Sequence, residues 1–210
     1  MNKILDILTK TNALITKSHF VLTSGMHSSI YVNKDAMYPY THYASEVGKL
    51  FAQKFKKLNI DVVAAPALGG IILSQWTAYH LSKLKRKNIL GVYTEKTLEK
   101  NQIFTRGYEK LVKEKNVLVV EDLTTTGGSV KKVINSIKNH GGKVIAVGVM
   151  LNRDPKNVNS KTIGAPFYSL GELITQNYQP QNCPLCKKKI PINTSVGHGK
   201  KFLASKRNQV

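Results

Sequence analysis

Val117-Leu-Val-Val-Glu-Asp-Leu-Thr-Thr-Thr-Gly-Gly-Ser-Val130 is the most informative stretch of this chain. A short apolar run followed by turn residues predicts a buried strand. The glycines let backbone N–H groups converge without obstruction by side chains. The segment that follows, up to His140, is expected to be a helix, and the first turn of a helix offers unpaired N–H groups to an anion. The stretch therefore predicts a strand, a loop and a helix that together bind a phosphate group.

Two carboxylates, Glu121 and Asp122, separate the strand from the loop. Carboxylates repel phosphate, but they accept hydrogen bonds from vicinal hydroxyls such as O2 and O3 of a ribose. Hydroxyl groups that donate to a phosphate follow at Thr124, Thr125, Thr126 and Ser129. The loop lacks the Gly-Lys-Ser/Thr ending of a P-loop, and Gly-x-Gly-x-x-Gly is absent. This composition favours a site that holds a phosphate and a sugar diol together.

The same order of strand, glycine loop and helix occurs earlier in the chain, where Gly69-Gly70 follows an apolar run. Such repetition predicts a parallel sheet with right-handed crossovers, that is, a doubly wound α/β fold. Ligands of these sheets bind beyond the carboxyl ends of the strands, where both glycine loops fall. Strands are expected at 62–65, 89–93, 117–120 and 144–151, a hairpin at 20–33, and helices at 2–16, 41–58, 71–84 and 129–140, with Thr41 as an N-cap.

The composition suits a soluble folded chain: 41% of the 210 residues are hydrophobic and 21% are charged. No apolar run approaches the roughly 18–20 residues of a membrane span. The first ten residues contain Lys3, Asp6 and Lys10, so they predict an amphipathic helix rather than a signal peptide. A cytoplasmic location follows as the expectation.

The chain has a net charge of +20, from 32 basic and 12 acidic residues. Arginine occurs only at positions 86, 106, 153 and 207, so lysine supplies nearly all of the excess. Base readout and bidentate phosphate contacts favour arginine. The charge is therefore interpreted mainly as a solvated surface, with a polyanionic partner as the alternative.

The stretch from Val117 to Val130 resembles the phosphoribosyl pyrophosphate (PRPP) signature of type I phosphoribosyltransferases. The resemblance implies that Glu121 and Asp122 act on the ribose as catalytic residues. It also identifies Ala65-Pro-Ala-Leu-Gly-Gly-Ile71 as the loop that holds pyrophosphate. The PRPP-binding residues that it implies are Glu121, Asp122, Leu123, Thr124, Thr125, Thr126, Gly127, Gly128, Ser129, Gly69 and Gly70.

The acceptor base is indicated by other segments. Phe20 to Asn33 resembles the N-terminal hood of orotate phosphoribosyltransferases, and Leu151-Asn-Arg-Asp154 resembles the strand end whose arginine meets orotate. A guanidinium suits a planar carboxylate because it forms two parallel hydrogen bonds. The resemblance implies that Thr125 and Arg153 bind orotate. It also implies transfer of the phosphoribosyl group of PRPP to orotate, which releases pyrophosphate and forms orotidine 5'-monophosphate in pyrimidine biosynthesis.

The resemblance also implies a cofactor, a partner and a third catalytic residue. Mg²⁺ is expected to bind through PRPP rather than directly to the protein, and the chain is expected to form a homodimer. Lys96 resembles the leading lysine of the family's mobile loop, and Lys100 and Arg106 are further candidates. The loop of this chain contains no histidine, and Leu68 stands where related enzymes carry a cation.

A single phosphoribosyltransferase domain is expected over residues 1–200. It would comprise a hood at about 1–40, a mobile loop or hairpin at about 95–115 and a tail at about 178–200, with residues 201–210 disordered. The tail, which contains Cys183-Pro-Leu-Cys186, resembles that of a subgroup of orotate phosphoribosyltransferases.

Three alternatives remain open at this point. In the first alternative, the acceptor is another base, such as a purine. In the second, the chain is a PRPP-sensing regulator that binds nucleic acid without turnover. No basic helix with interleaved aromatic residues supports the second alternative. Cys183 and Cys186 supply half of the ligands of a zinc site, with His198 as a possible third ligand and a partner chain as a possible source of more; a turn with two thiols is the other interpretation.

Overall fold

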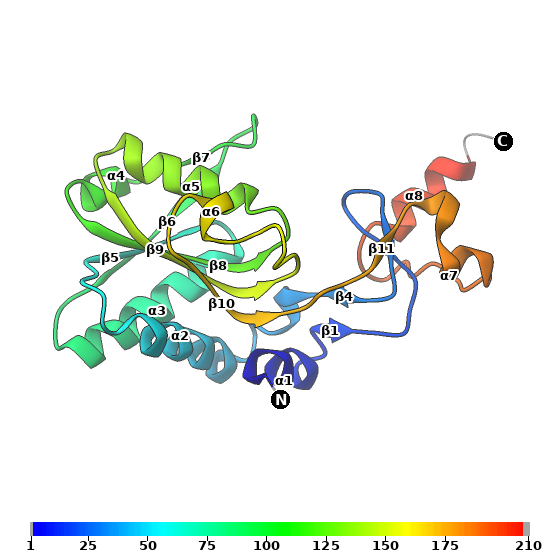
Figure 1. Ribbon diagram of the computed structural model, residues 1–210, viewed down its shortest axis with the longest axis horizontal. Helices are drawn as coiled ribbons and strands as arrows, with labels where there is room; N and C mark the ends of the chain where they lie inside the picture. Colours follow the sequence, from blue (N-terminus) through cyan, green and yellow to red (C-terminus); the bar gives the residue numbers. More distant parts are fainter. Residues whose placement is uncertain (1, 208–210) are drawn as a thin grey trace. The chain divides into compact units, whose positions relative to one another are not determined.

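The computed structural model describes residues 2–207, which divide between two compact units. The larger unit contains residues 1–4 and 38–173, and the smaller unit contains residues 5–37 and 174–210. Figure 1 shows the elements of both units. The chain thus divides into a larger unit with one continuous main segment and a smaller unit built from two distant segments, and the single domain expected over residues 1–200 stays a prediction.

A six-stranded sheet forms the centre of the larger unit, in the order β10-β9-β8-β5-β6-β7. All neighbouring strands are parallel except β6 and β7, which are antiparallel. This arrangement confirms the predicted α/β fold with a mainly parallel sheet. The strands are β5 (Val62–Pro66), β6 (Leu90–Lys96), β7 (Gln102–Ile103), β8 (Asn116–Thr124), β9 (Lys143–Asn152) and β10 (Phe167–Glu172).

Helices cover both faces of this sheet, as Figure 1 shows. The helices α2 (Thr41–Phe55) and α3 (Gly69–Lys85) pack together on one face, while α4 (Tyr108–Val112) and α5 (Gly128–Asn139) lie on the other. A short helix, α6 (Ser160–Ile163), connects β9 to β10. Each of α3 and α5 follows a strand of the sheet directly, so both begin at its carboxyl edge.

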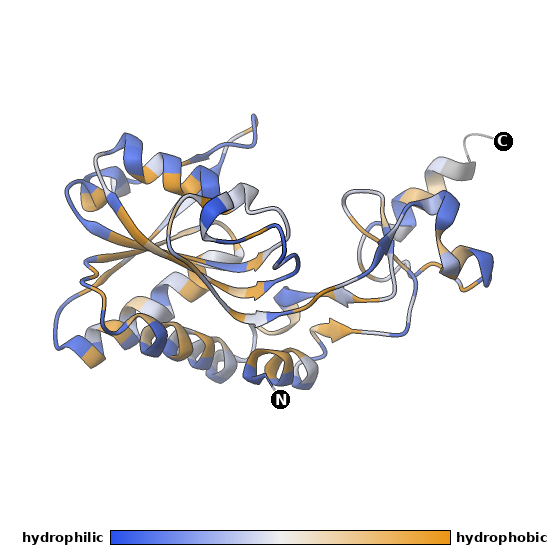
Figure 2. Cartoon of the chain, in the orientation of Figure 1, coloured by the Kyte–Doolittle hydropathy of each residue, from blue (hydrophilic) through white to orange (hydrophobic). Residues whose placement is uncertain are grey.

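Alternating strand residues supply two apolar layers. Val117 and Val119 of β8 lie in one buried cluster with Val133 and Ile137 of α5. Gly148 of β9 faces the opposite layer. In Figure 2 the middle of the sheet is orange, and the covering helices carry orange on one side and blue on the other. The sheet is therefore buried on both faces, which explains why its strands are continuous apolar runs.

The smaller unit contains short antiparallel pairs. Its first pair joins β1 (Leu14–Ile15) to β4 (Tyr31–Val32), and a three-stranded sheet joins β2 (Phe20–Val21), β3 (His27–Ser28) and β11 (Asn177–Tyr178). The remaining helices of the chain are α1 (Lys3–Lys10), which begins in the larger unit, and η1 (Lys34–Ala36), η2 (Pro180–Asn182), α7 (Pro184–Lys187) and α8 (Gly199–Arg207).

Several boundaries differ from the sequence-based expectation. The first helix ends at Lys10, since Leu14 and Ile15 pair with β4 instead. Tyr40, rather than Thr41, occupies the N-cap of α2. Residues 199–207, which include the first part of the segment expected to be disordered, form α8; residues 208–210 lie outside the described part of the chain. Strand β10 was not predicted.

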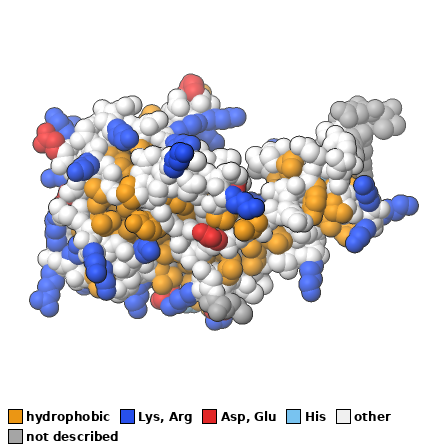
Figure 3. Space-filling view, viewed as in Figure 1, with side chains coloured by type: hydrophobic (Ala, Val, Ile, Leu, Met, Phe, Trp, Pro, Cys, Tyr) orange, Lys and Arg blue, Asp and Glu red, His pale blue; other side chains and the backbone are white. Residues whose placement is uncertain are grey.

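The described residues also bear on the expectations about membranes and charge. Within residues 2–207, none of the helices has both the length and the apolar character of a membrane span. Figure 3 shows lysine and arginine side chains spread over the visible face of the larger unit rather than gathered in one patch.

Close packing of α2 against α3 generates a prediction about stability. A Cβ added at Gly48 would lie 2.5 Å from Cβ of Trp76 and 2.7 Å from its carbonyl carbon. Gly48→Ala should therefore lower the free energy of unfolding by about 1–3 kcal/mol, the usual cost of overpacking. In an exposed helix the same substitution would instead stabilise by about 1 kcal/mol. Urea denaturation of the variant, with exposed Lys49→Ala as the control, measures the difference; an unchanged or raised midpoint for Gly48→Ala would contradict the packing.

Candidate active site

The two glycine loops lie at the same edge of the sheet. β5 and β8 are neighbouring parallel strands, and their pairing runs from Val62 opposite Val117 to Ala64 opposite Val119. Both strands continue beyond this pairing to their carboxyl ends, β5 to Pro66 and β8 to Thr124. The loops and the helices α3 and α5 begin directly after these ends. The predicted juxtaposition of the two loops is therefore present.

Hydroxyl groups hold the loop after β8 in its shape. The backbone N–H of Gly127 donates to Oγ1 of buried Thr124 at 3.0 Å, and that of Gly128 donates to Oγ1 of Thr126 at 3.4 Å. The remaining hydroxyl residues, Thr125 and Ser129, are exposed. One part of the predicted hydroxyl set thus stabilises the turn, and another part faces the solvent.

Both the backbone conformation at position 127 and the side chains around it require a glycine there. Its φ of +74° lies in the left-handed region, and a Cβ at this position would be 2.5 Å from Cδ1 of Ile163. Gly127 is also the N-cap of α5, so no side-chain oxygen of the cap covers the first turn of the helix. The N–H groups of that turn and the positive end of the helix dipole favour an anion at this point.

Both predicted acidic residues are buried at the end of β8. Glu121 is 7% exposed and Asp122 is 4% exposed. Oε1 of Glu121 accepts the backbone N–H of Asp122 at 3.0 Å, and Oδ2 of Asp122 accepts the phenolic O–H of Tyr38 at 3.0 Å. Leu123, between the acids and the loop, is half-buried. Tyr38 is the partner that sequence reasoning missed, because no local pattern relates it to a residue 84 positions away.

The loop after β5 requires glycine for a different reason. A Cβ at Gly70 would lie 2.8 Å from Cβ of Ala65, so the start of α3 approaches the end of β5 too closely for a larger residue. Gly69 is the first residue of α3, and Leu68 is its N-cap. The side chain of Leu68 is 82% exposed. As at α5, no side chain caps the start of the helix, although Gly69 and Gly70 are themselves buried.

A cavity of about 540 Å³ adjoins this second loop. Its lining consists of Ala67, Leu68, Ile71, Tyr93, Glu95, Lys96 and Arg106. The segment predicted as a mobile loop or hairpin is a hairpin of β6 and β7 followed by α4, with Glu95 paired to Ile103. Lys96 ends β6 and lines the cavity, whereas Lys100 does not.

An ion pair distinguishes Arg106 from Lys96, the two cationic residues that line the cavity. Nε of Arg106 donates to Oε1 of Glu95 at 2.9 Å. This hydrogen bond lowers the pKa of Glu95 and raises the pKa of Arg106, so both groups are charged at neutral pH. Because Glu95 balances the charge of Arg106, Lys96 is the stronger candidate for an anion in the cavity.

Arg153 follows β9 at the same edge. Strand β9 pairs with β8 up to Asn152 opposite Thr124, and the N–H of Arg153 donates to the carbonyl of Thr124 at 2.9 Å. The side-chain amide of buried Asn152 donates to the carbonyl of Val158 at 3.0 Å, and its oxygen accepts the N–H of Asp154 at 3.1 Å. These bonds fix the turn that carries Arg153 beside the loop with Thr125. Asn152 was not identified from the sequence.

The two cysteines lie in the smaller unit and outside this edge of the sheet. Their thiols contact His19 and His27, which sequence reasoning did not connect with them. The sequence suggested His198 as a third ligand. Its Nε2 instead lies 3.0 Å from Oγ1 of Thr23.

Known proteins are similar to this chain in sequence. Residues 35–183 match the family model described as the phosphoribosyl transferase domain. The orotate phosphoribosyltransferase of Caldanaerobacter subterraneus subsp. tengcongensis is 40% identical over 190 residues, which cover 90% of this chain and 94% of that protein. The orotate phosphoribosyltransferase of Thermotoga maritima is 39% identical over 196 residues, which cover 93% of this chain and 98% of that protein.

A solved structure confirms the fold. The orotate phosphoribosyltransferase of Mycobacterium tuberculosis H37Rv, crystallised in complex with PRPP, aligns with a TM-score of 0.61 at 19% identity, over 82% of this chain and 95% of that one. The family match covers most of the chain, and the similarity to the curated relatives extends over nearly all of it. This chain therefore belongs to the type I phosphoribosyltransferase family, among the orotate phosphoribosyltransferases.

Proposed function

We propose that this protein is an orotate phosphoribosyltransferase of pyrimidine biosynthesis, which transfers the phosphoribosyl group of PRPP to orotate and releases pyrophosphate. The observation that carries this proposal is the convergence of two uncapped helix starts, a buried acidic pair and an arginine turn at one edge of the sheet. The close similarity to curated orotate phosphoribosyltransferases supports the choice of base.

The loop after β8 is assigned to the 5-phosphate and the ribose of PRPP. The N–H groups at the start of α5, together with the hydroxyls of Thr125 and Ser129, are suited to the phosphate. Glu121 and Asp122, near the end of β8 and just before this loop, are assigned to the ribose diol. The hydrogen bond from Tyr38 leaves Asp122 with other lone pairs for the O2 and O3 hydroxyls, since an ionised carboxylate has about four acceptor sites.

The loop after β5 is assigned to the pyrophosphate group. Gly69 and Gly70 permit close approach to the first backbone N–H groups of α3, and Lys96 supplies a positive charge across the cavity. Oxygen ligands suit Mg²⁺, which commonly binds through one or two carboxylates and the phosphates of a substrate. Here Mg²⁺ would bind through the pyrophosphate and the ribose hydroxyls of PRPP rather than directly to the protein. Glu121 and Asp122 would hold those hydroxyls, and the ion would neutralise charge on the leaving pyrophosphate.

The reaction follows from these positions. The bond between C1 of the ribose and the pyrophosphate oxygen breaks, and positive charge develops on the ribose ring. N1 of orotate forms the new bond to C1 and gives up its proton to the departing pyrophosphate, while Arg153 and Thr125 orient the orotate carboxylate and ring. Catalysis then consists of orientation and of electrostatic stabilisation of the leaving group, with no covalent intermediate on the protein. Exclusion of water by the β6–β7 hairpin would protect the cation.

Two further properties are proposed on family grounds alone. The chain is expected to form a homodimer and to act in the cytoplasm. Sedimentation of the purified protein would measure whether it forms a dimer.

The direct test is the loss of orotate absorbance in the presence of PRPP and Mg²⁺. Orotate should be consumed, with one pyrophosphate released for each orotate. A panel of adenine, guanine and hypoxanthine under the same conditions tests the alternative acceptor bases. Turnover of a purine without turnover of orotate would overturn the assignment, and so would salt-dependent binding of nucleic acid without any turnover.

Asp122→Asn should reduce kcat/KM for PRPP at least tenfold, because the neutral amide replaces a charged acceptor of the ribose hydroxyls. Asp61→Asn is the matched control. Asp61 lies before β5 at the opposite edge of the sheet, where it pairs with Lys87 at 2.5 Å. Steady-state kinetics of both variants test whether Asp122 contributes to the reaction with PRPP. Equal activity of Asp122→Asn and the wild type would remove Asp122 from the site.

Arg153→Ala should lower kcat/KM for orotate at least tenfold and leave the affinity for PRPP nearly unchanged, since truncation removes two charge-assisted hydrogen bonds to the acceptor only. Exposed Lys156→Ala removes the same charge three residues away and serves as the control. Initial rates at varied orotate and fixed PRPP measure the effect. A loss confined to PRPP binding would place Arg153 elsewhere.

Lys96→Ala and Lys100→Ala distinguish the candidate cations of the hairpin. Because only Lys96 lines the cavity, Lys96→Ala should raise the KM for pyrophosphate in the reverse reaction about tenfold or more, while Lys100→Ala changes it less than twofold. Formation of orotate from orotidine 5'-monophosphate and pyrophosphate provides the assay. The opposite ranking of the two variants would contradict the assignment of the cavity.

A further inference from the structure

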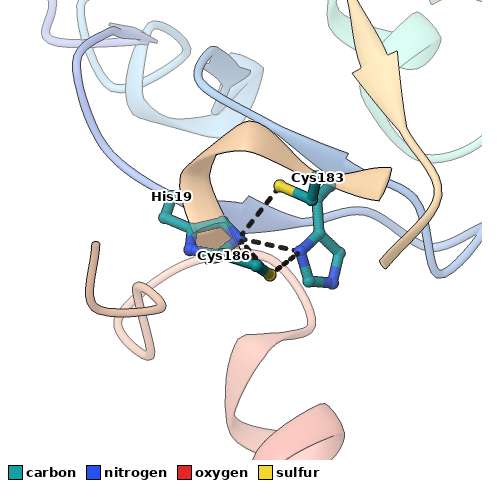
Figure 4. Close-up of side chains that lie close together, drawn as sticks. His19, Cys183 and Cys186 are labelled. Atoms are coloured by element: carbon teal, nitrogen blue, oxygen red, sulfur yellow. Dashed lines mark hydrogen bonds between the residues drawn. The ribbon is translucent and has the colours of Figure 1, made fainter. Parts of the chain in front are cut away.

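Four potential metal ligands meet inside the smaller unit. They are His19, His27, Cys183 and Cys186, and their ligand atoms all lie within 4.8 Å of one another. His19, His27 and Cys183 are buried, and Cys186 is half-buried. Figure 4 shows the thiols of Cys183 and Cys186 directed toward the ring of His19. We propose that these four side chains bind one zinc ion, which joins the first and last segments of the smaller unit.

The distances between the atoms suit a tetrahedral ion. Sγ of Cys183 and Sγ of Cys186 are each 3.8 Å from Nε2 of His19, and Sγ of Cys186 is 3.4 Å from Nδ1 of His27. Bonds of about 2.3 Å to sulfur and about 2.0 Å to nitrogen place tetrahedral ligands roughly 3.3–3.8 Å apart. The two ring nitrogens, at 2.7 Å, are closer than this, and the ion would separate them by roughly half an ångström.

A carbonyl group orients the first histidine for metal binding. Nδ1 of His19 is 2.8 Å from the carbonyl oxygen of Ile190. Because a carbonyl only accepts hydrogen bonds, Nδ1 carries the proton and Nε2 directs its lone pair toward the cysteines. Histidine ligands of metals characteristically donate their second N–H to such an acceptor. The bond to Ile190 is thus the expected outer contact of a metal ligand.

The backbone brings the four ligands together through long-range pairing. Strand β3 places His27 between Val21 of β2 and Tyr178 of β11. His19 pairs with Ile192, and its carbonyl accepts the N–H of Asn193 at 2.8 Å. Cys183 is the N-cap of α7, and Cys186 lies in the single turn of this helix. The ligands are therefore positioned by main-chain contacts rather than by the flexibility of their own side chains.

The ligand set indicates the kind of ion and its role. Two thiolates and two imidazoles are the donors of structural zinc sites, whereas Mg²⁺ and Ca²⁺ prefer oxygen. Four protein ligands leave no open position for a substrate, which favours a structural rather than a catalytic ion. All four come from a single chain, so the partner chain considered at the sequence level is not required.

A structural ion would stabilise a unit that is small and built from two distant segments. The smaller unit consists of residues 5–37 and 174–210, and Cys183 is 164 positions from His19. Units of fewer than about 70–80 residues seldom bury enough apolar surface to fold without a disulfide or a metal. The two cysteines form no disulfide. A zinc ion would hold the two segments together and so contribute directly to the folding free energy of the unit.

Metal analysis of the full chain tests the proposal. Protein purified without a histidine tag and without chelators should contain close to one zinc per chain. After removal of zinc, Co²⁺ should bind with the intense visible absorption of a tetrahedral site and a thiolate-to-cobalt charge-transfer band. Zinc below about a tenth of an equivalent, together with no such cobalt spectrum, would overturn the proposal whatever the variants do.

Variants locate the ion. Cys186→Ser and His27→Ala should each weaken zinc binding at least tenfold in a competition with a chromophoric chelator. His198→Ala is the matched control, because His198 lies in the same unit but bonds to Thr23 instead of the cluster. Zinc content that is retained by Cys186→Ser and His27→Ala, or lost equally in His198→Ala, would contradict the assignment. The cobalt spectrum of the wild type remains decisive if a variant does not fold.

Discussion

The parallel pairing of β5, β8 and β9 is the constraint on which the rest of the site depends. Their apolar residues are buried on both faces of the sheet, so a shift of one residue would exchange the side chains of two packed layers and disrupt both. The register that results brings the ends of β8 and β9 opposite each other at Thr124 and Asn152. Two helix starts and the turn of Arg153 must then lie at one edge, where backbone N–H groups face a common ligand.

Sequence analysis succeeded where the signal was local. The strand from Val117, the acids at its end and the glycine loop are contiguous, and their order predicted the fold; the binding of PRPP by this loop stays a prediction. The sequence did not reveal Tyr38 or Asn152, because each acts through a partner that folding brings near: Tyr38 donates to Asp122, and Asn152 holds the turn that carries Arg153.

The smaller unit explains the other shortcomings. Its strands contain two residues each, which is too short for any periodicity, and β11 pairs with a strand about 150 positions earlier. Local reasoning therefore found Cys183 and Cys186 but neither histidine beside them. Helix α8 was missed because a lysine-rich terminal segment has the composition of a frayed end. Long-range contacts, rather than propensity, determine this part of the fold.

The most direct measurement is a crystal structure of the protein with PRPP and Mg²⁺. The account predicts the 5-phosphate at the start of α5, against the backbone N–H groups of its first turn and the hydroxyls of Thr125 and Ser129, with the ribose hydroxyls at Glu121 and Asp122. Density for PRPP at another place, or a loop left empty at saturating PRPP while the protein remains folded, would contradict the central claim that this strand end binds the activated sugar phosphate.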